Sequence, residues 1–117
     1  MNLAAGRPAT GTSALAWPLQ LTDGDIWADS GVDNSGEYTY TTAQGLQAVV
    51  IDLGAVYSVD QVRLWHYVGN GRTYHNTKTE VSADGQTWET VYDSAVSGEY
   101  PETAEGKTLA FTARPVR

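Results

Sequence analysis

Residues 77–92 decide the fold class, and they read Thr-Lys-Thr-Glu-Val-Ser-Ala-Asp-Gly-Gln-Thr-Trp-Glu-Thr-Val-Tyr. Over the first seven of these residues, small or apolar side chains alternate with polar ones, the two-residue period of a half-buried strand. Asp84 and Gly85 then mark a hairpin turn, because both tolerate positive φ. The return strand carries Trp88 and Tyr92 on one face. This stretch predicts an antiparallel β-hairpin.

Strand patterns recur elsewhere in the chain, and no segment shows the 3.6-residue period of a helix. Residues 46–53 are predicted to form a buried strand that ends at Gly54, residues 61–68 a second strand and residues 107–113 a third. The first 45 residues are rich in Gly, Ser, Thr, Asp and Ala and predict long ordered loops around one short strand. Several short strands joined by Gly- and Asp-rich turns indicate an all-β antiparallel sandwich or barrel.

The amino-acid composition of the chain excludes some kinds of site and disfavours some kinds of binding partner. The chain has 117 residues, which is the length of one domain, and no cysteine, so it holds neither a disulfide nor a thiolate metal site. Its formal net charge of −7 disfavours nucleic acids and anionic membranes, which attract basic surfaces. No stretch is long and apolar enough to insert into a bilayer.

Four short motifs follow one another in a recognisable order: Asn2-Leu3-Ala4-Ala5-Gly6-Arg7-Pro8-Ala9-Thr10, Leu21-Thr22-Asp23-Gly24-Asp25 with Trp27, Val49-Val50-Ile51-Asp52-Leu53-Gly54 with Tyr57-Ser58-Val59, and Val81-Ser82-Ala83-Asp84-Gly85-Gln86-Thr87-Trp88. Their order resembles the discoidin, or coagulation factor type C, family, which includes the family-32 carbohydrate-binding modules. The resemblance implies one discoidin-like jelly roll over residues 1–117, similar to galactose-binding domains, with loops at one end forming a ligand site. It also implies an extracellular or cell-surface protein.

The chain differs from that family at its C-terminal end. Members continue past a segment like Ala113-Arg114-Pro115-Val116-Arg117 into further strands, so we expect the domain to lack its last strand or strands and to be C-terminally truncated. An open sheet edge recruits other strands. A partner chain or a homo-oligomer that completes the sheet is therefore expected.

The Asp-Gly loop is a candidate calcium site. A hard cation takes six to eight oxygen ligands, and Asp23 and Asp25 offer two carboxylates across Gly24. In relatives, a carbonyl about three residues before the motif contributes, which here is Gln20, and Ser30 supplies a further oxygen in this hypothesis. Such a calcium ion would be structural. The alternative is an Asx turn without metal.

Residues 65–78 form the candidate ligand site, because Gly69-Asn70-Gly71 breaks the strand into a loop surrounded by aromatic and hydrogen-bonding side chains. Sugars stack on flat aromatic faces, and their hydroxyls pair with fork-shaped donors. Trp65 and Trp88 are assigned to the core. The predicted ligand-binding residues are Arg72, His75, Tyr74, Asn76, His66 and Tyr67.

Two functions remain open at this level. The favoured one is a non-catalytic carbohydrate-binding module, and the alternative is a protein-adhesion or assembly domain completed by a strand from a partner chain. A phospholipid-binding domain would need basic residues. An enzyme is disfavoured because no catalytic constellation is visible, and the carboxylates of Glu99 and Glu102 are assigned to a solvated acidic turn.

Overall fold

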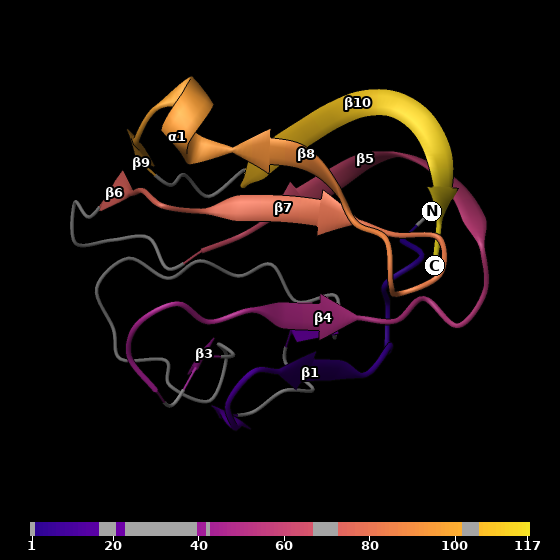
Figure 1. Cartoon of the computed structure of the whole chain (residues 1–117), viewed down its shortest axis with the longest axis horizontal. Coiled ribbons are helices and arrows are strands. Elements are labelled where there is room, and N and C mark those ends of the chain that lie inside the picture. The colour runs from indigo at the N-terminus through magenta and orange to yellow at the C-terminus, as the bar shows by residue number, and fades with distance from the viewer. Residues whose placement is uncertain (1, 17–20, 23–39, 42, 67–72, 102–105) are drawn as a thin grey trace. The chain divides into compact units, whose positions relative to one another are not determined.

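The computed structural model describes residues 2–16, 21–22, 40–41, 43–66, 73–101 and 106–117, and these residues are almost entirely strands and turns (Figure 1). The elements, in order, are β1 (Ala9–Gly11), β2 (Leu15–Ala16), β3 (Tyr40–Thr41), β4 (Val49–Ile51), β5 (Tyr57–Leu64), β6 (Thr73–Tyr74), β7 (Lys78–Val81), β8 (Glu89–Asp93), α1 (Ser94–Ser97), β9 (Tyr100–Pro101) and β10 (Lys107–Val116). All strand pairs are antiparallel. The predicted all-β antiparallel class is confirmed, and the one helix among the described residues is a single turn.

The chain divides into two compact units, and the first contains the described residues up to Gly54. In it, β1 pairs with β4 and β2 with β3. The strand predicted over residues 46–53 is shorter, because β4 covers only Val49–Ile51. Leu46 is 96% exposed and lies outside β4. The segment before β4 is instead attached to the segment after β1 by the side chain of Gln47. Its Oε1 atom accepts hydrogen bonds from the hydroxyl groups of Thr12 and Ser13 (2.8 and 2.7 Å).

The second unit, from Ala55 onward, is organised by the long ladder of β5 and β10. Figure 1 shows β10 curving along β5. The register pairs Leu109 with Val62 and Val116 with Tyr57, and it shifts between Ala110 and Arg114. This β-bulge reverses the inward–outward phase, so burial alternates on both sides of it with a break in the middle. Alternation alone predicts strands at residues 61–68 and 107–113. In the structure, β5 instead covers Tyr57–Leu64, and β10 continues to Val116.

The predicted hairpin is confirmed as β7 paired with β8. Its connection is longer than two residues because side chains organise it. The Asp84 carboxylate accepts hydrogen bonds from the backbone N–H groups of Gln86 and Thr87 (both 2.8 Å), and Ser82 Oγ accepts one from Gly85 (2.8 Å). β8 begins only at residue 89, so Trp88 lies in the connection and is 43% exposed. The assignment of Trp88 to the core is wrong.

The core of the second unit is formed by Val81, Tyr100, Leu109 and Val116, which are 4–8% exposed. The N–H of Arg117 donates to the Ser82 carbonyl (2.8 Å), which ties the end of β10 to the residue after β7. Completion of the sheet by strands from a partner chain stays a prediction.

Candidate functional site

The candidate site is built on the short ladder of β6 and β9, in which Thr73 pairs with Pro101 and Tyr74 with Tyr100. Successive side chains of a strand point to opposite faces. Tyr74 and Tyr100 accordingly turn toward the interior, where Tyr100 is buried, whereas Glu99 lies beside Thr73 on the exposed side. The ladder thus has an aromatic inner face and a polar outer face.

The inner face carries an aromatic cluster. The His66 and Tyr74 rings stack with their centroids 4.5 Å apart and an interplanar angle of 28°, and Tyr100 lies 6.3 Å from His66 and 6.1 Å from Tyr74. Tyr92 of β8 meets Tyr100 edge-on. The Lys107 ammonium lies 4.6 Å from the Tyr100 ring centroid and 5.5 Å from that of Tyr92, within the range of cation–π attraction. Offset and edge-on contacts are the favoured geometries of aromatic pairs, so they stabilise the packing of this cluster.

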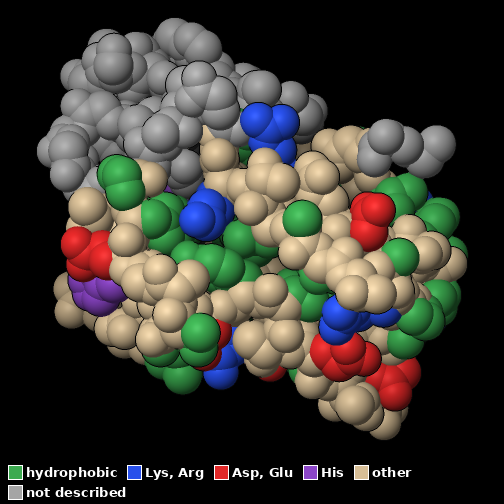
Figure 2. Space-filling model, turned by 90° about the horizontal axis from the view of Figure 1, so that it is seen from above, with side chains coloured by type: hydrophobic (Ala, Val, Ile, Leu, Met, Phe, Trp, Pro, Cys, Tyr) green, Lys and Arg blue, Asp and Glu red, His purple; other side chains and the backbone are tan. Residues whose placement is uncertain are grey.

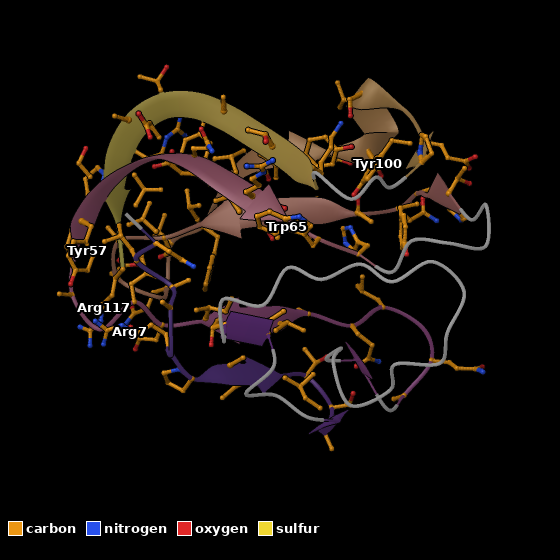
Figure 3. The ribbon with its side chains drawn as sticks, turned by 180° about the vertical axis from the view of Figure 1, so that it is seen from behind. Arg7, Tyr57, Trp65, Tyr100 and Arg117 are labelled. Atoms are coloured by element: carbon orange, nitrogen blue, oxygen red, sulfur yellow. The ribbon has the colours of Figure 1, made fainter. Side chains whose placement is uncertain are left out.

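Trp65 packs against Gly106, the residue that precedes β10. It follows the end of β5, as Figure 3 shows. Its ring approaches Gly106 so closely that a Cβ built on that glycine would lie 2.8 Å from Trp65 atoms and from the Leu64 carbonyl. Arg63 places its guanidinium 5.0 Å from the Trp65 ring centroid. Trp65 is half-buried, in agreement with a packing role.

The outer face carries polar side chains in contact with one another. Thr73 donates a hydrogen bond to Glu99 Oε1 (2.8 Å), and His75 Nδ1 lies 3.6 Å from Glu99 Oε2. The side chains of His75 and Glu99 are 64% and 55% exposed. Figure 2 shows histidine and acidic side chains in contact at one edge of the molecular surface. This face therefore presents donors and acceptors to solvent on a fixed backbone.

Asn76 ends this segment with a left-handed backbone, φ 54°, a conformation that non-glycine residues adopt rarely and asparagine adopts most readily. The next residue is held on both sides. The Thr77 N–H donates to Ser94 Oγ (2.8 Å), and the Ser94 N–H donates to the Thr77 carbonyl (2.9 Å). Ser94 itself begins α1, whose N-cap is Asp93. The turn at Asn76 is therefore anchored to a capped helical turn, which fixes the positions of both His75 and Asn76.

The six residues predicted to bind ligand are divided by the structure. His66 and Tyr74 are half-buried in the aromatic cluster, and His75 and Asn76 are exposed on the surface. Arg72 and Tyr67 lie outside the described residues.

Sequence reasoning missed the partners that β9 and β10 contribute. The segment from Glu99 was assigned to a solvated acidic turn, and this is wrong at Tyr100, which is only 8% exposed. The signal was the Tyr-Pro pair, because proline suits an edge strand and an aromatic residue needs a packing partner. Lys107 was likewise read only as part of a strand.

The residues predicted to bind calcium, Asp23, Asp25, Gln20 and Ser30, lie outside the described residues. Within the residues that the structure describes, no three His, Cys, Asp or Glu side chains are grouped so that they could hold a metal ion.

Among the described residues, no helix is long and apolar enough to cross a membrane.

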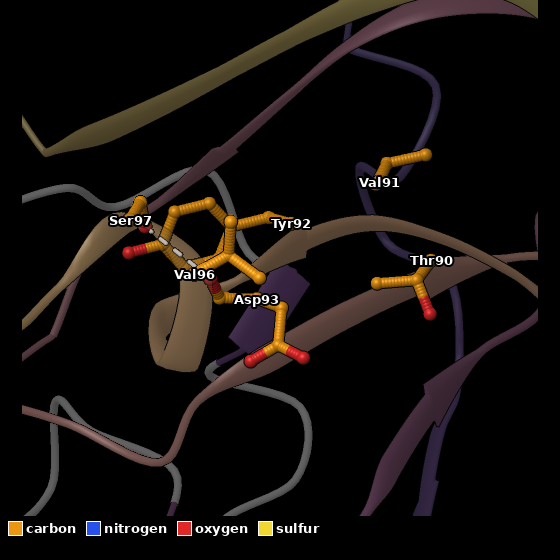
Figure 4. Close-up of a pocket in the computed structure, with 6 residues that line it drawn as sticks. All are labelled: Thr90, Val91, Tyr92, Asp93, Val96 and Ser97. Atoms are coloured by element: carbon orange, nitrogen blue, oxygen red, sulfur yellow. Dashed lines mark hydrogen bonds between the residues drawn. The ribbon is translucent and has the colours of Figure 1, made fainter.

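An open pocket of about 320 Å³ lies elsewhere in the second unit, between β8 and α1. Figure 4 shows its lining residues, Thr90, Val91, Tyr92, Asp93, Val96 and Ser97. Its one acidic group is used locally, because Asp93 accepts a hydrogen bond from the Ala95 N–H (2.9 Å) as a helix cap.

Comparison with known proteins agrees with this architecture. A family model of the factor 5/8 type C group, described as a NedA-like, galactose-binding domain, matches residues 21–117. A chitosan-binding module of a chitosanase/glucanase from Paenibacillus sp. IK-5 is 26% identical with a TM-score of 0.57, and the match covers 100% of this chain and 81% of that one. A family-32 carbohydrate-binding module from Clostridium perfringens, solved with GalNAc-β-1,3-galactose, is 19% identical with a TM-score of 0.62, covering 98% and 81%. None of the curated proteins matches the sequence significantly.

Proposed function

Because this chain belongs to the factor 5/8 type C family of NedA-like, galactose-binding domains, we propose that it is a non-catalytic carbohydrate-binding module. Its ligand is held at the β6–β9 ladder. We propose an extracellular or cell-surface location for it, as the resemblance to carbohydrate-binding modules implies.

The observation that carries the proposal is the pairing of an aromatic cluster, which includes Tyr74 of β6, with exposed hydrogen-bonding side chains that directly follow this strand. The stacked His66 and Tyr74 rings form the inner support, and His75 and Asn76 follow directly along the chain on the surface. An imidazole and a carboxamide together supply donors and acceptors for sugar hydroxyls. Because the backbone on both sides is anchored, the ordering cost of binding is low.

The relatives support a sugar as the ligand class. The module from Paenibacillus is described as chitosan-binding, and the matching family model is described as galactose-binding. Binding surfaces of this kind bury little area, so a single site gives modest affinity and gains avidity when several modules act together. Adhesion to a polysaccharide surface is therefore the proposed role.

The test is a calorimetric titration with galactose, N-acetylgalactosamine and chitosan oligosaccharides. His75→Ala and Asn76→Gly remove the two exposed side chains. Glycine accepts the left-handed backbone at position 76, so this second variant removes the carboxamide without straining the turn. Lys78→Ala, an exposed position on β7, is the matched control.

We expect the two site variants to lose about 1–3 kcal/mol of binding free energy, the range for an unmade directional hydrogen bond, while their melting curves stay close to that of the wild type. The control is expected to bind like the wild type. Equal binding by all four proteins would move the site away from this ladder, and release of shortened sugars during incubation would contradict the non-catalytic role.

A further inference from the structure

We infer that Glu99 makes the site selective for a sugar that carries a free ammonium group over its N-acetylated or neutral counterparts. This inference rests on the proposed function, since it names the substrate class of the same site. The residue involved was not among those that the sequence singled out for binding.

The first step is the placement of the carboxylate. Glu99 immediately precedes β9, and its side chain is 55% exposed. The Thr73 hydroxyl donates to Oε1 (2.8 Å), which holds the carboxylate against β6. An ionised carboxylate has about four acceptor positions, so this bond and the His75 contact leave acceptor positions on the solvent side. The carboxylate is therefore both fixed in place and able to accept further hydrogen bonds.

The second step concerns the nearby cation. The Lys107 ammonium lies over the rings of Tyr100 and Tyr92. It is thus directed to the inner face, whereas the Glu99 contacts, Thr73 and His75, lie on the outer face. Among the residues that the structure describes, the basic side chain in contact with Glu99 is His75, and the Glu99 side chain is 55% exposed, so its negative charge faces solvent.

The third step is the chemistry of the ligand. An ammonium group has three N–H donors and a positive charge, so it pairs with a carboxylate in a charge-assisted hydrogen bond. N-acetylation removes the charge and two of the donors. The formal net charge of −7 also attracts cationic oligosaccharides from a distance. The exposed side chains of His75 and Asn76 can then contact the hydroxyls of the same sugar ring.

The experiment compares two probes that differ only in the amino group, a glucosamine oligosaccharide and its fully N-acetylated form, with galactose as a neutral reference. Each is titrated calorimetrically into the wild type, Glu99→Gln and Glu80→Gln. Glu80 is the matched control because it is an exposed glutamate on β7 near a threonine hydroxyl, Thr90 Oγ1, at 3.5 Å. Both variants change the net charge equally, so they separate a local contact from the long-range field.

We expect the wild type to bind the glucosamine oligosaccharide more tightly than the acetylated one. Glu99→Gln should weaken the glucosamine affinity by roughly threefold to tenfold, as for an exposed charge-assisted contact, and leave the other two probes unchanged. Glu80→Gln should have much less effect, and added salt should reduce the wild-type preference.

Three results would overturn the inference: equal wild-type affinity for both oligosaccharides, equal weakening of all probes by Glu99→Gln, or equal weakening of glucosamine binding by both variants. In each of these the module still binds sugar, so the proposed function stands. If the wild type binds none of the three probes, the proposed function fails as well.

Discussion

The β5–β10 ladder and the β6–β9 ladder lie in the same unit and differ in almost every respect. The first is formed by strands of eight and ten residues and buries Leu109 and Val116. The second pairs only two residues on each strand, and the side chains around it are aromatic on one face and polar on the other. The long ladder is built by burial of aliphatic side chains, and the short one by rings and hydrogen bonds.

The difference is the physical reason why the proposed site lies on the short ladder. Apolar burial contributes about 25 cal/mol per Å², so the long ladder stabilises the fold without needing polar groups at its surface. The short ladder pairs few backbone groups and depends on side-chain contacts, which leaves His75, Asn76 and Glu99 exposed on a backbone that the rest of the unit holds in place. Substitutions in the two ladders should therefore act on different properties.

The largest effect is expected from Leu109→Ala. Leu109 is 4% exposed and lies opposite Val62 in the long ladder. The change should lower the free energy of unfolding by about 2–5 kcal/mol, because it removes apolar contacts and leaves a cavity. Chemical denaturation followed by tryptophan fluorescence measures this. At temperatures where the variant stays folded, its affinity for sugar should equal that of the wild type. A loss of affinity in the folded variant would contradict the assignment of stability to the long ladder and binding to the short one.

A smaller loss of stability is expected from Gly106→Ala, at the start of β10. Gly106 has φ 78°, and an added Cβ would lie 2.8 Å from the Leu64 carbonyl and from the Trp65 ring. The change should cost about 1–3 kcal/mol of unfolding free energy through backbone strain and displacement of the indole. Gly85→Ala is the control, since it shares a positive φ but meets nothing within 4 Å. Equal losses in both variants would show that φ, and not the packing of Trp65, is responsible.

Calcium provides a test in the N-terminal part of the chain, at the predicted ligands Asp23 and Asp25. If Asp23 and Asp25 bind the ion in the native state alone, a calcium concentration ten times the dissociation constant should stabilise the fold by about 1.4 kcal/mol. Differential scanning calorimetry with calcium, and with magnesium as the control ion, measures the shift. Asp23→Ala should abolish it. If calcium leaves the melting curve of the wild type unchanged, the prediction of a structural calcium ion is wrong.

The smallest effect concerns the hairpin connection. Hydrogen bonds from the Thr87 and Gln86 N–H groups, and then from Ser82, lower the pKa of the Asp84 carboxyl below 3.8. A lowered pKa in the folded state stabilises the fold above pH 3.8, and this contribution is lost as the pH falls through the folded-state value. Asp84→Asn should therefore reduce the drop in stability between pH 5 and the most acidic range. Urea denaturation across that range tests it, and an unchanged slope in the variant would contradict the assignment.

The hairpin could be read from the sequence, because alternation and the Asp84-Gly85 turn are local signals. The same alternation indicates strands at residues 61–68 and 107–113, but not that these strands pair with each other. The start of β5 at Tyr57 and the C-terminal part of β10 could not be read, since the register shifts between Ala110 and Arg114, and this bulge reverses the phase on which alternation depends. The residues that β9 and its neighbour contribute to the candidate site were missed because they are distant from β6 in the sequence. Tyr100 and Glu99 reach β6 from 26 residues further along the chain, and only the fold brings them together.

The same limit applies to Trp88 and to residues 46–53. Trp88 is in phase with Tyr92, and residues 46–53 are largely apolar, but hydrogen bonds of Ser82, Asp84 and Gln47 organise the neighbouring loops and end the ladders early. Side-chain hydrogen bonds of this kind compete with strand pairing and leave little trace in hydrophobic periodicity.

The central claim is that sugar binds at the β6–β9 ladder. The most direct measurement is a two-dimensional amide NMR titration of the intact protein with the tightest-binding sugar of the panel. We predict that the largest shifts fall on residues 73–76 and on Glu99 and Tyr100, while the amides of β5 and the C-terminal half of β10 stay in place. Shifts confined to β8 and α1, around the pocket formed by Thr90 and Val96, or to the unit that ends at Gly54, would contradict the account.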